Sequence, residues 1–264
     1  MVFKQNIIMT EADQKILTID IGGSNIKATI LNMQGTFLNE YERLPTPSPA
    51  TPGKVLDVIQ LLAKKFPAYD KIAAGFPGFI KDGIVKTAPN LGTAQWVNFN
   101  LNKKLEEILG KPAIAVNDAD LQGLSVVSGK GVEMMITLGT GFGSAILNDG
   151  VLIPHLEIAH HPITKNKDYD AYIGEYEFKR IGKKKWNKRM RRVIRILKVV
   201  FNYDRLYISG GSAREINFKL DDNIIIVGNR DGIKGGAKLW EQQNKVIADS
   251  VNTDTADEVQ DFVV

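Results

Sequence analysis

An aspartate stands directly after a predicted buried strand in the segment AIAVNDAD, residues 113–120. Ligands of α/β proteins bind at the carboxyl ends of strands, so Asp118 could accept the proton of a substrate hydroxyl as that hydroxyl attacks phosphorus. Asn and Asp are also favoured helix N-caps, and a helix is predicted to follow this segment. Asn117, Asp118 and Asp120 are therefore candidates for either role.

Three glycine-rich turns also follow predicted strands: DIGGSNIK (20–27), LGTGFGS (138–144) and ISGGSA (208–213). Successive backbone N–H groups in such turns can bind phosphate oxygens, although a tight turn alone explains any one of them. None matches a Walker loop or the dinucleotide fingerprint. The candidate residues for binding a phosphate donor are Gly22, Gly23, Ser24, Lys27, Gly139, Thr140, Gly141, Gly210 and Gly211.

Asp20 begins the first of these turns. A carboxylate beside a phosphate-binding turn repels the phosphate unless a cation lies between them. Mg²⁺ takes oxygen ligands and usually keeps several waters, so Asp20 is a candidate to hold Mg²⁺ through water. The alternative is an aspartate at a strand end that accepts a hydrogen bond from the turn.

All three histidines lie in one segment, PHLEIAHHP, residues 154–162. Glu157 and His160 offer hydrogen-bond acceptors and donors to a polyhydroxylated ligand. A tetrahedral metal site is poorly supported, because the chain has no other histidine and no cysteine. For His161, which precedes a proline, a structural role is favoured.

A strongly basic stretch covers residues 179–198, KRIGKKKWNKRMRRVIRILK, which hold eleven Lys and Arg and no acid. The net charge of the whole chain is only +4, so positive charge is concentrated here. Apolar residues recur at helical spacing from Trp186 onward. Neighbouring like charges on a helix repel, which indicates a polyanionic partner, although a solvated helix face is the alternative. Lys184, Lys188 and Arg192 are the candidate contacts.

Length and composition limit the fold and the location. The 264 residues are enough for one large domain or two lobes. The absence of cysteine excludes disulfides, thiolate metal sites and cysteine nucleophiles. No apolar run reaches the roughly 18 residues of a spanning helix, and the N-terminus does not resemble a signal peptide. We therefore expect a cytoplasmic protein with no membrane partner.

The order of predicted elements is strand, glycine turn, strand and further α/β elements, and this order occurs twice. It predicts an α/β protein with two lobes and a central cleft. We predict an N-terminal extension over 1–15 and a small lobe with the first phosphate turn over 16–118. A large lobe over 119–243 would contain the second turn and the basic helix, and 244–264 would be a flexible tail.

Together these segments resemble the ROK family of sugar kinases, over residues 16–240. The resemblance implies a two-lobed actin-like ATPase fold, also described as ribonuclease H-like or hexokinase-type. DIGGSNIK and LGTGFGSA resemble the family's phosphate motifs, and ISGGSA resembles the motif that closes over the donor. AGFPG and TAPNLGTAQW resemble sugar-site segments, VNDAD the catalytic segment, and LEIAHH the E-x-G-H motif with Ala159 in place of glycine.

This resemblance assigns roles to individual residues. It implies that Asp118 deprotonates the sugar 6-hydroxyl and that Asp20 organises Mg²⁺ through water. It also implies a homodimer. The residues that would bind the sugar hydroxyls are Asn90, Asn117, Asp118, Glu157 and His160.

The chain departs from many family members after the E-x-G-H histidine, where they carry a cysteine-rich zinc motif. Here the segment is HPITKNKDYDAYIGEY, so no zinc is expected. PTPSPATP and FPGFIKDGIVKTAPN resemble most the zinc-free branch of polyphosphate-dependent glucokinases. The resemblance thus implies glucose phosphorylation with Mg²⁺ and with polyphosphate, ATP or both as donor.

Three other functions are each compatible with part of the sequence. The nearest is an ATP-dependent hexose or N-acylhexosamine kinase of the same family. A sugar-responsive nucleic-acid-binding regulator is disfavoured, because about fifteen residues before the first strand are too few for a helix-turn-helix domain. A non-catalytic sugar-binding protein would be expected to lack Asp118. We expect no nucleic-acid partner.

Overall fold

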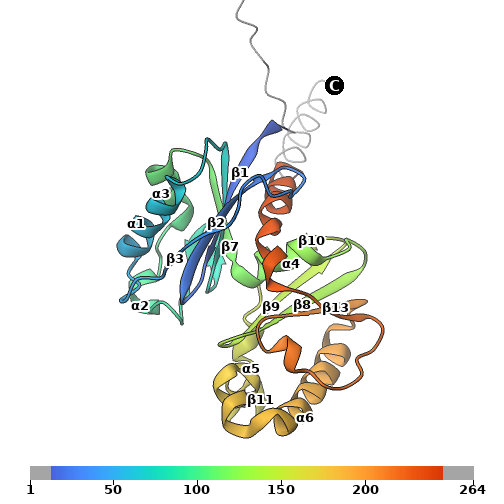
Figure 1. Ribbon diagram of the computed structural model, residues 1–264. Helices are drawn as coiled ribbons and strands as arrows, with labels where there is room; N and C mark the ends of the chain where they lie inside the picture. Colours follow the sequence, from blue (N-terminus) through green and yellow to red (C-terminus); the bar gives the residue numbers. More distant parts are fainter. Residues whose placement is uncertain (1–12, 246–264) are drawn as a thin grey trace, which may run out of the picture.

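The computed structural model describes residues 13–245, which form two five-stranded sheets with helices around and between them (Figure 1). In the first sheet the strand order is β3-β2-β1-β4-β7. The β1–β2 and β2–β3 pairs are antiparallel, whereas β1, β4 and β7 run parallel. The strands are β1 (Lys15–Ile21), β2 (Asn25–Asn32), β3 (Glu42–Pro45), β4 (Lys71–Phe76) and β7 (Ala113–Asn117).

The second sheet repeats this plan with the order β10-β9-β8-β13-β14. Again an antiparallel hairpin, β8–β9, is followed by parallel strands, β8, β13 and β14. The two predicted cycles of strand, glycine turn and strand are thus confirmed as two sheets of like topology. The strands are β8 (Val132–Leu138), β9 (Phe142–Asn148), β10 (Val151–Leu152), β13 (Arg205–Ser209) and β14 (Ile224–Ile226).

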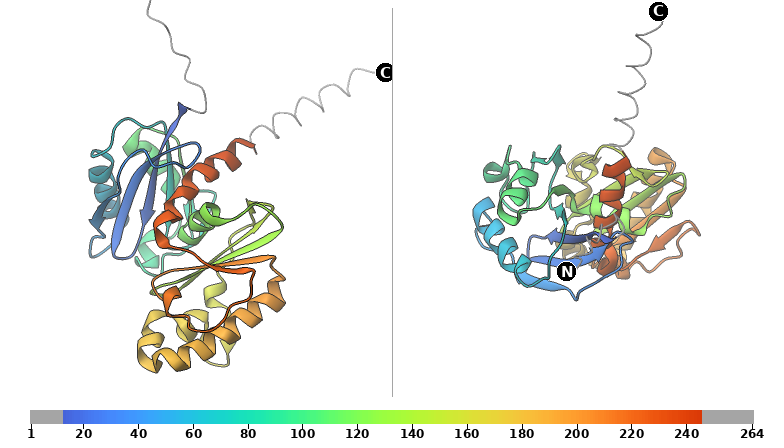
Figure 2. Two further views of the ribbon diagram at one scale, coloured as in Figure 1. Left: turned by 45° about the vertical axis from the view of Figure 1, so that its right-hand side comes forward. Right: turned by 90° about the horizontal axis from the view of Figure 1, so that it is seen from above.

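Each sheet has its own outer helical layer (Figures 1 and 2). The helices α1 (Pro52–Ala63) and α3 (Leu101–Leu109) pack on the first sheet, and α5 (Tyr169–Ile173) and α6 (Glu175–Phe201) pack on the second. Sequence signals fix the first of these helices, since Thr51 caps α1 and a proline opens it.

The space between the sheets is filled by α4 (Asp118–Val126) and by a helix over residues 235–245. The second helix packs very closely against α4, because a Cβ on Gly235 would lie 1.8 Å from the Leu121 carbonyl oxygen. Trp240 Nε1 donates to the Ile72 carbonyl in β4 at 3.1 Å. The predicted boundary at Asp118 falls at the start of α4, which contacts both sheets. The division into lobes therefore stays a prediction.

Some predicted elements differ from the structure. The sequence predicts that FLNEYERL, residues 37–44, continues as a strand, but only Glu42–Pro45 pairs as β3, and Phe37 forms an isolated bridge with Leu31. Residues 244 and 245 lie in the helix over 235–245, and the rest of the predicted tail lies outside the described residues.

The short elements are β5 (Ile80–Lys81), β6 (Ile84–Val85), α2 (Thr93–Trp96), η2 (Ile158–His160), β11 (Pro162–Thr164), β12 (Lys167–Asp168), η3 (Ala213–Glu215) and η4 (Asn229–Lys234). None of the helices over residues 13–245 could cross a membrane.

The basic stretch belongs to α6, which begins earlier than predicted, at Glu175, and bends at Gly182, where φ is 76°. The predicted core-facing residues from Trp186 to Leu197 are buried, and Phe201 is partly buried. Trp186 also donates its indole N–H to the Ile173 carbonyl at 2.8 Å. The helical period therefore placed the apolar side of this helix correctly.

Acids from outside the stretch offset part of its charge. The Glu177 side chain is 3% exposed and lies 2.6 Å from each of Lys167, Arg180 and Arg189. The hydrogen bond from Arg180, with those from Lys167 and Arg189, holds the pKa of Glu177 far below its usual range. Two more ion pairs, Lys183–Glu215 at 2.9 Å and Lys198–Asp221 at 2.7 Å, connect α6 to later segments.

We predict that Glu177→Gln lowers the free energy of unfolding by about 2–4 kcal/mol at neutral pH, because three cations lose their shared carboxylate. The pKa of this group is lowered by folding, so its contribution is present above the ordinary value of 4.5 and is lost as the pH falls below it. Urea unfolding at several pH values measures this. Glu175→Gln is the control, because its exposed pair with Lys179 contributes only about 0.5 kcal/mol. Equal stability of both variants at neutral pH would contradict the prediction.

Candidate active site

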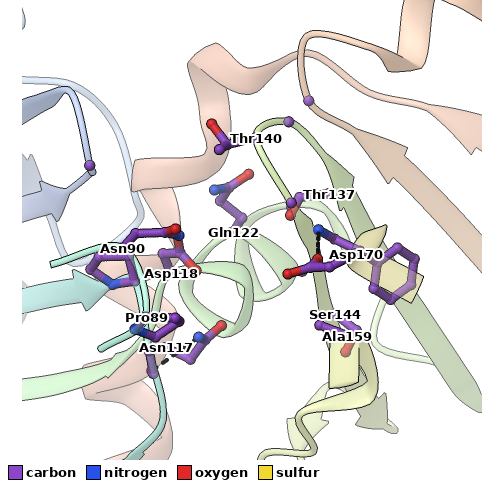
Figure 3. Close-up of a pocket in the computed structure, with 18 of the residues that line it drawn as sticks. Pro89, Asn90, Asn117, Asp118, Gln122, Thr137, Thr140, Ser144, Ala159 and Asp170 are labelled. Atoms are coloured by element: carbon purple, nitrogen blue, oxygen red, sulfur yellow. Dashed lines mark hydrogen bonds between the residues drawn. The ribbon is translucent and has the colours of Figure 1, made fainter. Parts of the chain in front are cut away.

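A cleft of about 360 Å³ lies where the glycine turns of the two sheets meet the first turn of α4. Most of the residues predicted from the sequence line it together. The predicted donor contacts among them are Gly22, Gly23, Lys27, Gly139, Thr140, Gly141, Gly210 and Gly211. The predicted sugar contacts are Asn90, Asn117, Asp118, Glu157 and His160, and the predicted metal ligand is Asp20. Figure 3 shows Asn90, Asp118 and Thr140 around this space.

Four predicted donor contacts are not among the residues that line the cleft: Ser24, Lys184, Lys188 and Arg192. The Ser24 carbonyl accepts from the Thr46 amide at 3.0 Å, next to the first glycine turn. Lys184, Lys188 and Arg192 are exposed on α6, and Arg192 Nη2 donates to the Ile163 carbonyl at 3.2 Å. Within residues 13–245, Lys184 and Lys188 form no ion pair.

The glycine turns hold their shape through backbone contacts. In the first turn the Gly22 amide donates to the Asn25 carbonyl at 3.0 Å, and in the second the Gly139 amide donates to the Gly141 carbonyl at 3.1 Å. Gly210 has a φ of +97°, and a Cβ there would lie 2.2 Å from the Leu138 carbonyl oxygen. Only glycine fits at Gly210, where the third turn comes against the end of β8.

Asp20 and Lys27 face one another across the β1–β2 hairpin, where they are register partners. Lys27 Nζ lies 3.1 Å from Asp20 Oδ2. The lysine thus compensates the charge of the aspartate beside the first glycine turn. No group of three or more His, Cys, Asp or Glu suited to a metal occurs among the described residues. A single carboxylate suits Mg²⁺, which keeps waters and binds donor phosphates.

Asn117 acts as the cap of α4, as one of the two readings of the sequence predicted. Its Oδ1 accepts from the Ala119 amide at 2.8 Å, and its Nδ2 donates to the Gly78 carbonyl at 3.1 Å. Asn117 therefore joins the end of β7, the start of α4 and the AGFPG segment. Capping and a site role are compatible, because the same residue also lines the cleft.

Asp118 follows as the first residue of α4, and its Oδ1 also accepts from the Ala119 amide at 2.8 Å. Burial, reinforced by the negative charge of Asp20, raises the pKa of Asp118 to about 7. A carboxylate with a raised pKa at the centre of a cleft is suited to accept a proton near neutral pH.

The cleft includes residues that the sequence did not single out. Asp170 Oδ1 accepts from the Phe142 amide at 2.5 Å opposite Asp118 (Figure 3). Burial raises the pKa of Asp170. Gln122 lines the cleft one turn of helix after Asp118. No local signal marks either residue, because DYDAYIG looks like an ordinary helix start.

His155 is the third unexpected member of the site, and it lies deeper than His160. Its Nδ1 is 2.8 Å from Asp120 Oδ2. His160, which the sequence favoured, is half-exposed, with Nδ1 3.8 Å from Asp168 Oδ2. The clustering of histidines marked the right segment, but it could not show which ring would be buried.

A second cavity of about 490 Å³ adjoins the cleft and shares the residues Asp20, Lys27, Asp118 and Gln122 with it. Its remaining wall includes Arg43 of β3, Tyr41 just before this strand, and residues 232–233. Arg43 is the register partner of Lys27, so two cations stand side by side on adjacent strands. The second cavity therefore extends the cleft from Asp20 and Asp118 toward β3.

The sequence profile of the ROK family matches residues 16–165. A polyphosphate glucokinase of Mycobacterium tuberculosis (strain ATCC 25618 / H37Rv) is 32% identical over 223 residues, which are 80% of this chain and 82% of the relative. An N-acetylmannosamine kinase of Escherichia coli (strain SE11) is 33% identical over 144 residues, 52% of this chain and 48% of the relative.

Solved structures agree with these sequence matches. An inorganic polyphosphate/ATP-glucomannokinase from Arthrobacter sp. strain KM has a TM-score of 0.79 at 30% identity and covers 87% of this chain and 99% of its own. A ROK family glucokinase from Streptomyces griseus, in complex with glucose and AMPPNP, has a TM-score of 0.71 at 18% identity, with 85% and 98% covered. The latter shows the fold alone.

These matches and the geometry of the cleft define a sugar kinase with the two-lobed actin-like ATPase fold. The chain belongs to the ROK family. Its reaction is therefore phosphoryl transfer to a sugar.

Proposed function

We propose that this protein phosphorylates the 6-hydroxyl of glucose, with inorganic polyphosphate as donor and ATP as an alternative donor. The observation that carries the proposal is the position of Asp118, which lies between the glycine turns and the predicted sugar-binding side chains in one cleft. The names of the polyphosphate glucokinases and of the polyphosphate/ATP-glucomannokinase support the choice of sugar and donor.

In the proposed reaction Asp118 accepts the proton of the 6-hydroxyl as that oxygen attacks the terminal phosphorus of the donor. The new oxygen–phosphorus bond forms while the bond from this phosphorus to the rest of the donor breaks. Asn117 and Glu157 orient the sugar, and backbone amides of the glycine turns bind the donor phosphates. Asp20 would hold Mg²⁺ through water, and the metal would neutralise charge on the phosphates.

Besides the glycine turns, we propose that the exposed basic face of α6 binds polyphosphate. Lys184, Lys188 and Arg192 lie outside the cleft, so they would bind the distal phosphates of a long chain or raise its local concentration. Such contacts release counterions and are steeply dependent on salt. A homodimer is also proposed, on the resemblance to the family alone.

An ATP-dependent hexose or N-acylhexosamine kinase is the second candidate. It is favoured by the N-acetylmannosamine kinases among the relatives and by the absence of the basic residues of α6 from the cleft wall. The two candidates share the site and the base, and they differ in donor and sugar.

We predict that Asp118→Asn lowers kcat by about 10²–10⁴-fold, because the amide cannot accept the proton. Glucose binding should change little, since the amide still offers an oxygen and has nearly the same shape. Steady-state assays of glucose 6-phosphate formation and calorimetric titration with glucose measure the two effects. The control is Asp57→Asn on the exposed side of α1, which should behave like the wild type. Near-normal turnover of Asp118→Asn would show that another group is the base.

We also predict that joint substitution of Lys184, Lys188 and Arg192 by Gln raises the KM for long-chain polyphosphate about tenfold and flattens its dependence on salt. The KM for ATP should stay the same. Joint substitution of Lys64, Lys103 and Lys111 by Gln removes the same charge from other exposed positions and should leave both values unchanged. Unaltered polyphosphate kinetics in the first variant would show that this face of α6 does not bind polyphosphate and is an ordinary solvated surface.

A further inference from the structure

His155 has a well-defined environment that the proposed reaction does not use. It lies in the loop between β10 and η2, and its side chain is only 7% exposed. Its Nδ1 is 2.8 Å from Asp120 Oδ2 and its Nε2 is 3.6 Å from Glu157 Oε1. Phe79 stacks on the ring, with 5.8 Å between the centroids and 24° between the planes. The imidazole thus connects two carboxylates and is fixed by an aromatic neighbour.

The two carboxylates determine which form of the ring fits. A neutral imidazole carries a single N–H, whereas the imidazolium donates from both nitrogens. Burial opposes the charged form, but the hydrogen bond to Asp120 and the ion-pair contact with Glu157 outweigh it and raise the pKa of His155 to about 9. The same contact lowers the pKa of Glu157, and the charge of His155 also acts on Asp118. At neutral pH the His155 ring is therefore a cation between the carboxylates of Asp120 and Glu157.

The elements that His155 connects are the two sides of the site. Asp120 belongs to the first turn of α4, two residues after the proposed base. Glu157 lies in the loop before η2 and lines the cleft, where it is proposed to bind sugar hydroxyls. A charged bridge between them fixes the sugar-binding carboxylate relative to the helix that carries Asp118.

We propose that His155, as an imidazolium anchored by Asp120, is a positioning residue that holds the Glu157 carboxylate ionised and oriented for the sugar. The inference rests on the proposed role of Glu157 in sugar binding. It applies whether the donor is polyphosphate or ATP, because none of the three residues belongs to the glycine turns.

A dependence on pH follows. The charged groups that face the ring are Asp120, Glu157 and, further away, Asp118. The pKa of His155 is raised, so the bridge is complete below about pH 9 and is lost as the pH rises through that value. Deprotonation leaves one N–H, which the closer Asp120 retains. The KM for glucose should therefore rise above about pH 9, with a much smaller change in kcat.

The test compares His155→Gln, Glu157→Gln and the wild type in steady-state kinetics with glucose from pH 6 to 10 at saturating donor and Mg²⁺. His155→Gln should raise the KM for glucose about tenfold at pH 7.5, keep kcat within a few-fold, and remove the alkaline rise in KM. His161→Gln is the control, because His161 is exposed and does not line the cleft.

The outcomes separate this inference from the proposed function. If Glu157→Gln leaves the KM for glucose unchanged, the sugar-site assignment fails. If Glu157→Gln raises the KM but His155→Gln does not, the positioning role of His155 alone is overturned.

A second measurement uses the wild-type protein, so it can be made even if the His155→Gln variant does not fold. In the wild type, ¹⁵N NMR of the three histidine side chains should show one ring that stays doubly protonated up to about pH 9, and spectra of His160→Gln and His161→Gln assign it by elimination. A His155 ring that is neutral at pH 7.5 would overturn the inference.

Discussion

The cap of α4 is the contact on which the rest of the site depends. The Asn117 side chain accepts from the Ala119 amide and donates to the Gly78 carbonyl, so the end of β7, the helix and the AGFPG segment share one anchor. The helix itself is held between the sheets, where Gly235 packs against the Leu121 carbonyl. Any shift of α4 would therefore move Asp118 relative to the glycine turns and to the other residues that line the cleft.

The second constraint is electrostatic, because five carboxylates surround or adjoin the cleft: Asp20, Asp118, Asp120, Glu157 and Asp170. Lys27 compensates Asp20, and His155 compensates the two carboxylates on either side of it. Asp118 instead accepts a backbone hydrogen bond, and burial with the charge of Asp20 raises its pKa. Asp118 and Asp170 are the two carboxyl groups of this set without a cationic partner at ion-pair distance among the described residues, and the pKa of about 7 suits Asp118 to accept a proton near neutral pH.

The sequence predicted correctly those features that depend on residues near one another in the chain. The glycine turns at strand ends, the capping role of Asn117 and the apolar face of α6 all follow from turn geometry and helical period, and the structure has them. The contact of His155 with Asp120 and the ion pair between Lys183 and Glu215 could not be predicted in this way. His155 meets an acid 35 residues away, and the acids that offset α6 include one in a segment 32 residues distant. Such pairs depend on how the elements pack against one another, and the periodicity within one element does not predict this packing.

The most direct test of the central claim is to measure glucose 6-phosphate formation by the wild-type protein with Mg²⁺, with long-chain polyphosphate and ATP compared as donors under the same conditions. The account predicts turnover with both and a clearly higher kcat/KM for polyphosphate. A preference for ATP would contradict the assignment of the donor and leave the sugar kinase. Turnover of glucose with neither donor, alongside turnover of another sugar, would contradict the assignment of the substrate.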